Sequence, residues 1–267
     1  MTAYFDESYA ALPTNKGYMV VCGWIASVEE WERFEVDWKL FLISYKVPYF
    51  HMKEFAHSVG PYKKWAGTTF IRARFIKGAH EIIRRHVRKG LVCCIHDEQW
   101  QWADRLYKLR EDFPSTYAVA GRTCIDWAES IGRTSQQQVG CIFDDGNPGK
   151  GDLIRAADIA PMVPSPIFKP SRDVQDRKMG MRRGFVPIQA ADFLAYEISK
   201  YVKDVTNLLA TTNGKVKARE SLRMFGAKAP TTMFFDQRHL TAFCLHFGIG
   251  RRNLSANAPN AKGQAPR

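Results

Sequence analysis

Three acidic clusters interrupt otherwise apolar stretches of this 267-residue chain: Asp6–Glu7, Asp144–Asp145 and Asp192. The first two follow the segments TAYF and QVGCIF, and Asp192 lies within PIQAADFLAYE. An ionised carboxylate among apolar residues is costly unless an arginine, backbone N–H groups or a cation pairs with it. Two of the clusters end predicted strands, where ligand sites of α/β sheets gather. Carboxylates from distant segments could therefore meet around a cation.

Phosphodiester hydrolysis is the chemistry that such a cluster would serve. The reaction needs an activated water and a stabilised leaving oxygen, and two Mg²⁺ ions about 4 Å apart can supply both. Mg²⁺ takes oxygen ligands and keeps several waters, so a few carboxylates suffice. Each acid taken alone also has an ordinary interpretation, which is a salt bridge for Asp192 and a turn for the FDDG segment. Spacing by itself leaves these alternatives open.

The charge balance indicates a polyanionic partner, with nucleic acid first. The formal net charge is +12 and the isoelectric point is about 9.5, and basic side chains neutralise backbone phosphates. Basic runs occur at 84–89, 177–183 and 215–220. The alternative for each run is a solvated face. From the first two runs we expect nucleic-acid contacts by Arg84, Arg85, Arg88, Lys178, Arg182 and Arg183.

Composition narrows the class of protein. The chain is 45% hydrophobic and 13% aromatic, which supports a sizeable core. No apolar run reaches about 18 residues, so we expect no membrane-spanning helix, and the N-terminus lacks the pattern of a secretory signal. Six scattered cysteines form no CxxC pair, which argues against a zinc finger. We therefore expect reduced core cysteines and a cytoplasmic location.

The elements that must position the acids alternate between strands and helices. Strands are predicted at 2–8, ending on the first acids, and at 17–27. A helix follows, which Ser27 can cap and whose capping box Glu30 completes. Next come a helix ended by Gly90, a strand LVCCIHDEQW, and a loop or short helices at 101–115. A helix TYAVAGRTCIDWAESIGR then leads to a strand QQVGCIFDDG, which ends on the second acidic cluster. The last predicted elements are a helix DLIRAAD, a strand SPIFKPS, the Asp192 helix and a final helix DQRHLTAFCLHFGI.

This order predicts an α/β protein with one mixed sheet of about five strands and helices on its faces. We interpret residues 1–250 as one domain, within which 203–235 reads as an irregular, basic insertion. The polar residues 251–267 are expected to form a flexible tail.

The helix that carries Asp192 starts near Pro187, a residue suited to a first turn. At about 100° per residue, Asp192 lies at the edge of an apolar stripe and faces the sheet or its rim. Glu197 falls on the opposite side of the helix and is predicted to be solvated. Asp192 is therefore expected to point toward the other acids.

The segments YFDES, FHMKEF, CIFDDGNPGKG and VPIQAADFLAYE together resemble the large bacterial family known as the domain of unknown function DUF3800. The resemblance extends from Tyr4 to about Tyr201, and the QAADFLAYE and DES segments are its most specific marks. It implies an RNase H-like, or retroviral-integrase-like, fold. It also implies a nuclease centre that binds divalent metal, Mg²⁺ or Mn²⁺, as two ions, and that cuts DNA or RNA.

By this resemblance four acids are catalytic and bind the metal. Asp6 matches the first-strand acid, Glu54 a position that is often acidic, Asp144 the acid closing the fourth strand, and Asp192 the acid of the final motif helix. Asp145 is the neighbouring candidate ligand. The tyrosine of DESY stands where the family usually has glycine.

Three further residues could assist such a site: Glu7, His51 and Lys150. His51 could aid a metal or a phosphate, and the alternative is a packed or capping histidine. Lys150 could contact a phosphate, although NPGKG lacks the G-x-x-x-x-G-K-[ST] pattern of a P-loop. Two rivals to a nuclease stay open. One is a nucleic-acid-binding protein of the same fold without catalysis, and the other is a metal-dependent phosphoesterase that acts on small substrates.

Overall fold

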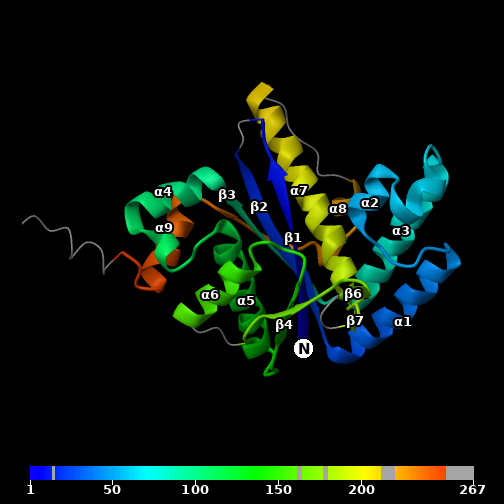
Figure 1. Ribbon diagram of the computed structural model, residues 1–267, viewed down its shortest axis with the longest axis horizontal. Coiled ribbons are helices and arrows are strands. Elements are labelled where there is room, and N and C mark those ends of the chain that lie inside the picture. The colour runs from blue at the N-terminus through cyan, green and yellow to red at the C-terminus, as the bar shows by residue number, and fades with distance from the viewer. Residues whose placement is uncertain (14–15, 161–163, 177–179, 212–219, 251–267) are drawn as a thin grey trace, which may run out of the picture.

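The computed structural model describes residues 1–13, 16–160, 164–176, 180–211 and 220–250 (Figure 1). Its centre is one six-stranded sheet with the strand order β5-β4-β1-β2-β3-β8. The strands are β1 (Thr2–Ala11), β2 (Gly17–Ala26), β3 (Lys89–His96), β4 (Gly140–Asp144), β5 (Ile167–Lys169) and β8 (Thr231–Phe235). β2 is antiparallel to both β1 and β3, whereas β4 is parallel to β1, β5 to β4 and β8 to β3. The predicted mixed sheet of an α/β protein is confirmed, with six strands rather than about five.

Helices cover both faces of the sheet. The α-helices are α1 (Val28–Ser44), α2 (Met52–His57), α3 (Thr69–His86), α4 (Asp97–Tyr107), α5 (Thr116–Thr134), α6 (Lys150–Ile159), α7 (Ile188–Thr211), α8 (Glu220–Arg223) and α9 (Gln237–His246). Short 3-10 helices occupy Gly60–Trp65, Leu109–Glu111 and Gly226–Lys228. In Figure 1, α1, α2, α3 and α7 lie on one side of the sheet, and α4, α5, α6 and α9 on the other.

Two hydrophobic cores follow from this layering. Alternate residues of a strand point to opposite faces. Tyr4 and Val20 accordingly join the core beneath α1, α3 and α7, whereas Phe5 and Val21 join the core beneath α5 and α9. All six cysteines are buried and unpaired, as expected for core residues. No helix among the described residues is long and apolar enough to cross a membrane.

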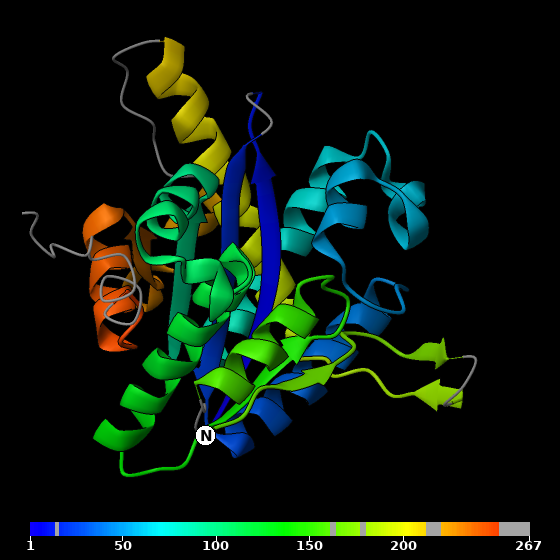
Figure 2. The same ribbon diagram turned by 60° about the vertical axis from the view of Figure 1, so that its left-hand side comes forward.

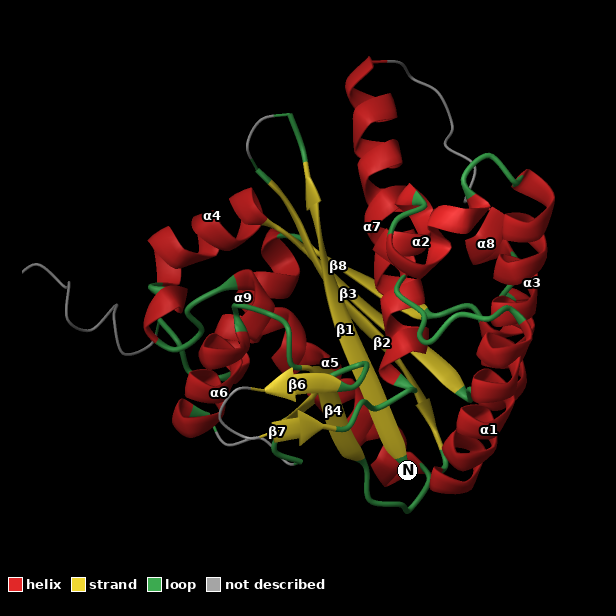
Figure 3. Ribbon diagram, turned by 45° about the vertical axis from the view of Figure 1, so that its right-hand side comes forward, coloured by secondary structure: helices red, strands yellow, loops and turns green. Residues whose placement is uncertain are grey.

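The helix α7 packs along β1 and β2 (Figure 3). The indole Nε1 of Trp24 on β2 donates to the carbonyl oxygen of Ala190 on α7 at 3.1 Å. Ala190, Ala191 and Ala195 are buried at this contact, and their small side chains let the helix backbone approach the sheet. This contact fixes the start of α7 against β2, beside Tyr4 of β1.

Several boundaries agree with the sequence and several differ. Ser27 Oγ accepts from the backbone N–H of Glu30 at 3.1 Å, so the predicted cap of α1 is confirmed. By contrast, α3 ends at His86 rather than at Gly90, which lies in β3. A side chain at Gly90 would meet the Trp24 ring at 2.6 Å, so close packing rather than helix termination explains this glycine. The predicted first strand also ends too early, because β1 continues to Ala11 and places Asp6 in its middle.

The stretch 203–235 differs most from expectation. The first residues of this stretch, 203–211, belong to α7, which ends at Thr211. The last residues of the stretch form β8, which pairs with β3 at the edge of the sheet. Glu197 was expected in solvent but is only 2% exposed, and it accepts a hydrogen bond from the Ser221 hydroxyl. The sequence alone could not place Ser221 against α7. The tail 251–267 lies outside the described residues.

A two-stranded hairpin that the sequence did not predict stands away from the main sheet (Figure 2). It consists of β6 (Val174–Asp176) and β7 (Gly180–Arg182), paired antiparallel. Its neck is closed by Asp173 Oδ1, which accepts from the backbone N–H of Gly184 at 2.7 Å. This hairpin carries Arg182 to the region where the acids gather.

Candidate active site

Four carboxylates line one groove of about 700 Å³: Asp6, Glu7, Asp144 and Asp192. They come from the middle of β1, the end of β4 and the second turn of α7. The parallel register pairs Phe5 with Phe143, so Asp6 and Asp144 follow at neighbouring positions on adjacent strands. Because α7 packs on β1, Asp192 reaches the same place. All four residues are half-buried.

Asp192 is held by the segment that precedes α2. Its Oδ2 accepts from the backbone N–H of Met52 at 2.6 Å. The segment is held at a second point by Gln189, whose Oε1 accepts from the backbone N–H of Phe50 at 2.9 Å. Gln189 Oε1 also accepts from Trp38 Nε1 at 2.9 Å, and its Nε2 donates to the carbonyl oxygen of Ser171 at 2.8 Å. The amide therefore ties three separate segments to α7.

Sequence reasoning missed Gln189. A buried amide must have its hydrogen-bonding groups satisfied, and this one is only 3% exposed. The signal was a polar residue three positions before Asp192 in an otherwise apolar turn, since residues three apart share a helix face.

The carboxylates of the groove oppose one another's ionisation. Desolvation raises the pKa of Asp6 well above its ordinary value, and the charges of Glu7, Asp192 and Asp144 raise it further. Desolvation also raises the pKa of Asp192 to about 6, against the lowering effects of His51 and the Met52 N–H. The pKa of Glu7 is raised to about 7 by desolvation and by Asp144, although a hydrogen bond with Asn147 opposes this rise. A cation in the groove would relieve these costs.

The donors present fit a hard divalent cation. Carboxylate oxygens are the ligands that Mg²⁺ and Mn²⁺ prefer. Glu7 Oε2 is buried and has no hydrogen-bond partner, so it is an acceptor that a cation would satisfy. Over the described residues, however, no three acidic, histidine or cysteine side chains stand together as a preformed metal cluster. The site therefore offers suitable ligand types that must still move together around an ion.

Glu54 turns toward a different set of partners. Its Oε2 accepts from the Tyr49 hydroxyl at 2.8 Å, and its Oε1 accepts from Arg172 Nη1 at 3.1 Å. His51 Nδ1 lies 3.3 Å from the same Oε1. Desolvation raises the pKa of Glu54, but these three neighbours outweigh it and hold the pKa below its ordinary value. Glu54 does not line the groove of the other four acids.

Asp145 is likewise paired with cations. It forms ion pairs with Lys150 and with Arg182 Nη2, the latter at 2.5 Å. Despite desolvation, hydrogen bonds from these two side chains lower the pKa of Asp145. Asp144 instead lines the groove, where its Oδ2 accepts from the backbone N–H of Gly146 at 2.8 Å. Of the two adjacent aspartates, Asp144 therefore faces the groove and Asp145 faces basic side chains. Lys150 contacts Asp145 and does not line the groove.

Basic side chains border the groove as well. His51 lines it, together with Lys53, Lys200 and Lys203. The three lysines were not singled out from the sequence. The signal was helical spacing, because Lys200 and Lys203 follow Asp192 by 8 and 11 residues and so share its face of α7.

The basic runs divide between different places. Arg84, Arg85 and Arg88 do not line the groove, and Arg85 pairs with Asp37 at 3.1 Å. Arg182 lies beside Asp145, and Arg183 lines a separate hollow next to α1. Lys178 lies outside the described residues.

No family model matches the chain, and no curated protein matches it. Membership of the DUF3800 family therefore stays a prediction. Among solved structures, the chain is similar to RNase H3 from Aquifex aeolicus at 12% identity and a TM-score of 0.37. The match covers 82% of this chain and 65% of that enzyme's chain, which is less than two thirds of its length. The fold class given above rests on the strand order and directions.

Proposed function

We propose that this chain is a nuclease that uses Mg²⁺ or Mn²⁺ to hydrolyse phosphodiester bonds of DNA or RNA. The observation that carries the proposal is the groove in which Asp6, Glu7, Asp144 and Asp192 meet from distant segments. The raised pKa values of Asp6, Glu7 and Asp192 favour a bound cation. The formal net charge of +12 suits a polyanionic substrate.

In this proposal Asp6, Asp144 and Asp192 hold the metal, and Glu7 supplies a further oxygen. When bound, divalent ions activate a water and stabilise the leaving oxygen. Lys53, Lys200 and Lys203 border the same groove and would hold backbone phosphates on either side of the bond that is cut. Met52 and Gln189 position Asp192 and the segment before α2 through the hydrogen bonds described above.

A cleavage assay tests the proposal. Labelled single- and double-stranded DNA and RNA would be incubated with wild-type protein in Mg²⁺, in Mn²⁺ and in EDTA. Cleavage is expected with metal and not in EDTA, and Asp6→Asn and Asp192→Asn should each reduce the rate by at least about 100-fold. Glu32→Gln, an exposed acid of α1, should keep the wild-type rate. Metal-dependent cleavage that survives in both asparagine variants would refute the assignment.

One observation favours a second candidate, a nucleic-acid-binding protein without catalysis. The described residues contain no preformed set of three metal ligands. This candidate predicts binding that persists in EDTA and no cleavage in Mg²⁺ or Mn²⁺. Turnover of a small phosphate ester without cleavage of polymers would instead indicate a phosphoesterase.

A further inference from the structure

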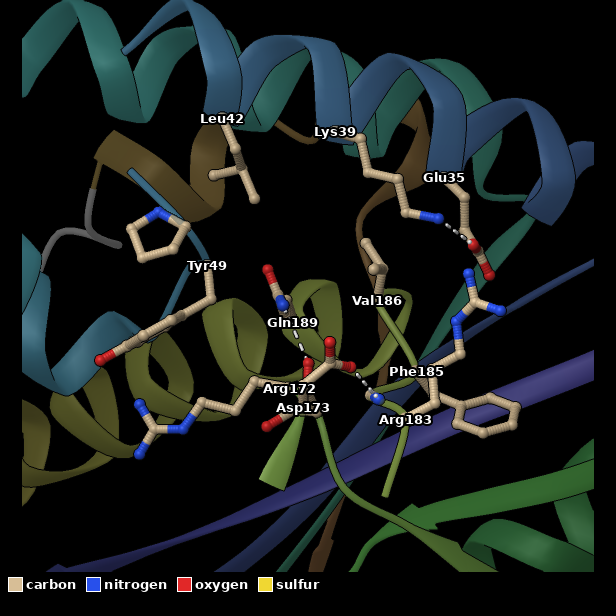
Figure 4. Close-up of a pocket in the computed structure, with 13 residues that line it drawn as sticks. Glu35, Lys39, Leu42, Tyr49, Arg172, Asp173, Arg183, Phe185, Val186 and Gln189 are labelled. Carbon is tan, nitrogen blue, oxygen red and sulfur yellow. Dashed lines mark hydrogen bonds and ion pairs between the residues drawn. The ribbon is translucent and has the colours of Figure 1, made fainter. Parts of the chain in front are cut away.

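A second hollow, of about 830 Å³, lies between α1 and the segments that flank the β6–β7 hairpin (Figure 4). Its size falls within the range of roughly 300–1,000 Å³ that is typical of small-molecule sites. Leu42 and Lys39 of α1 form one wall, and Arg172, Arg183 and Val186 lie on the chain opposite.

The lining of this hollow combines apolar surface with charged side chains, of which Lys39, Arg172 and Arg183 are basic and Glu35 and Asp173 are acidic. Lys39 pairs with Glu35 at 2.8 Å, which leaves Arg172 and Arg183 as the basic groups to meet an anion. Leu42, Pro48 and Val186 are apolar, and Tyr49 adds an aromatic ring. Arg172 and Arg183 extend along different sides of the opening in Figure 4. A simple anion would leave the apolar surface without a partner, and an apolar molecule would not use the arginines. A nucleotide, which joins a flat base to a phosphate, matches both features.

The polar groups in the floor are already engaged. The side-chain amide of Gln189 forms hydrogen bonds with Trp38, Phe50 and Ser171. Asp173 accepts from the Gly184 N–H at the hairpin neck. These bonds fix the shape of the hollow and leave little hydrogen bonding to read one base against another. The site therefore suits any base rather than a specific one.

The hollow adjoins the carboxylate groove. Ser171 lines both, and Arg172 lines the hollow as well as a smaller pocket that also contains Asp144 and His51. Arg172 is held at this boundary because its guanidinium lies 4.4 Å from the centre of the Tyr49 ring and pairs with Glu54. One nucleic-acid strand could therefore occupy both places, passing Arg172 between them.

We propose that this hollow holds one unpaired nucleotide of the substrate, adjacent to the nucleotide whose phosphate lies among the carboxylates. The inference rests on the proposed function and names its substrate class: a strand that is single or frayed at the cut. A base that is paired within a duplex cannot enter a pocket without leaving its stack. The protein should therefore bind single strands in preference to duplexes.

Binding in EDTA tests this preference without cleavage. The probes are a short labelled single strand, of DNA and separately of RNA, and the blunt duplex of the same sequence, measured by fluorescence anisotropy. The wild-type protein should bind the single strand about tenfold more tightly than the duplex, which is the order of magnitude that base stacking contributes. Val186→Trp, which fills the hollow, should remove the preference. Ile154→Trp on exposed α6 should keep it.

A second pair of variants keeps the test decisive if Val186→Trp does not fold. Arg183→Gln changes an exposed side chain of the hollow, and Arg155→Gln removes the same charge from α6. Both should weaken all binding slightly, but only Arg183→Gln should reduce the ratio of single-strand to duplex affinity. Equal wild-type affinity for the two probes would overturn the inference, as would an unchanged ratio in folded Val186→Trp and in Arg183→Gln.

The two proposals fail separately. A preference that Val186→Trp abolishes, in a protein that cleaves nothing with any metal, would support the nucleotide pocket and refute the nuclease. Metal-dependent cleavage that Asp192→Asn abolishes, with equal affinity for single and double strands, would support the nuclease and refute the pocket.

Discussion

Gln189 and Asp192 stand one turn apart on α7 and bind the two ends of one short segment. Gln189 Oε1 accepts from the backbone N–H of Phe50, and Asp192 Oδ2 accepts from that of Met52. The segment between them carries His51, which lines the groove. One turn of helix therefore sets the position of an acid and of a histidine that the sequence separates by about 140 residues.

Asp192→Asn is expected to stabilise the protein at pH 8 when no divalent metal is added. The folded pKa of about 6 lies above the ordinary value of 3.8, so the folded state binds this proton more tightly than the unfolded state does. Ionised Asp192 therefore lowers the free energy of unfolding of the wild-type protein. This loss is absent below pH 3.8, where the carboxyl is protonated in both states, and complete above pH 6, where it is ionised in both states. The gain in free energy of unfolding at pH 8 should be on the order of 1 kcal/mol after solvent screening.

Urea unfolding at pH 8 and near pH 4 would measure this difference. The gain should shrink toward zero at the lower pH. Glu32→Gln on exposed α1 should change the free energy of unfolding by less than about 0.5 kcal/mol at either pH. A variant that is less stable than wild type at pH 8 would contradict the raised pKa of Asp192.

Mn²⁺ binding to the wild-type protein should strengthen with pH. Glu7 and Asp192 have pKa values of about 7 and about 6, and a metal must displace their protons to use these oxygens. Calorimetry should show an affinity that rises from pH 5.5 toward 8, and proton release that is larger at pH 6 than at pH 8. An affinity that does not change across this interval would exclude both groups as ligands.

Substitution of Asp144 and of Asp145 should change the affinity for Mn²⁺ to different extents. Asp144→Asn removes a carboxylate of the groove and should weaken Mn²⁺ binding at least about tenfold. Asp145→Asn changes a side chain that is paired with Lys150 and Arg182, so it should leave Mn²⁺ affinity within about twofold. If calorimetry showed that Asp145→Asn weakens Mn²⁺ binding more than Asp144→Asn does, Asp145 would have to leave its ion pairs and bind the metal.

Glu54→Gln tests whether Glu54 binds metal, as the family resemblance implies, or only the neighbours seen in the structure. The resemblance makes Glu54 a metal ligand, whereas the structure pairs it with Tyr49, Arg172 and His51. We expect Mn²⁺ affinity within about twofold of wild type and weaker nucleic-acid binding, because Arg172 loses its anchor. If Glu54→Gln weakened Mn²⁺ binding as strongly as Asp144→Asn, Glu54 would have to rotate into the groove.

Gln189→Leu should destabilise the protein by about 2–4 kcal/mol. The substitution leaves the buried Trp38 Nε1 and Phe50 N–H groups without an acceptor, and each such group costs about 1–3 kcal/mol. Denaturant unfolding measures the loss. Gln237→Leu, at an exposed position of α9, is the matched control and should lie within about 0.5 kcal/mol of wild type.

The sequence anticipated the parts of the site that regular elements create. Short-range periodicity indicates the strands that carry Asp6 and Asp144 and the helical stripe beside Asp192. The pairing of β1 with β4, which brings the first two together, is a long-range contact that was not predicted. Glu54 was assigned by resemblance alone, and Asp145 as the neighbour of Asp144 in one acidic cluster. Their partners Arg172 and Arg182 come from a hairpin region whose position no local pattern reveals.

Long-range contacts also explain the errors in the fold. Strand β8 was hidden in a basic stretch because its five residues, Thr231–Phe235, are too short a run to show a clear period. Glu197 was assigned to solvent on helical geometry, but α8 covers that face of α7 and supplies Ser221. Helical spacing defines faces, and only tertiary packing decides which of them meet water.

The edge strand β8 has a consequence for the order of folding. It pairs in parallel with β3, although Thr231 and Leu91 are separated by 140 residues along the chain. During synthesis β3 can pair with β2 early, but its other edge stays open until β8, 140 residues later, has emerged. Open edges recruit other strands, and pairings of such separation form slowly. In nascent chains Leu91–Ile95 is therefore an open edge at which aggregation can begin until β8 pairs with it.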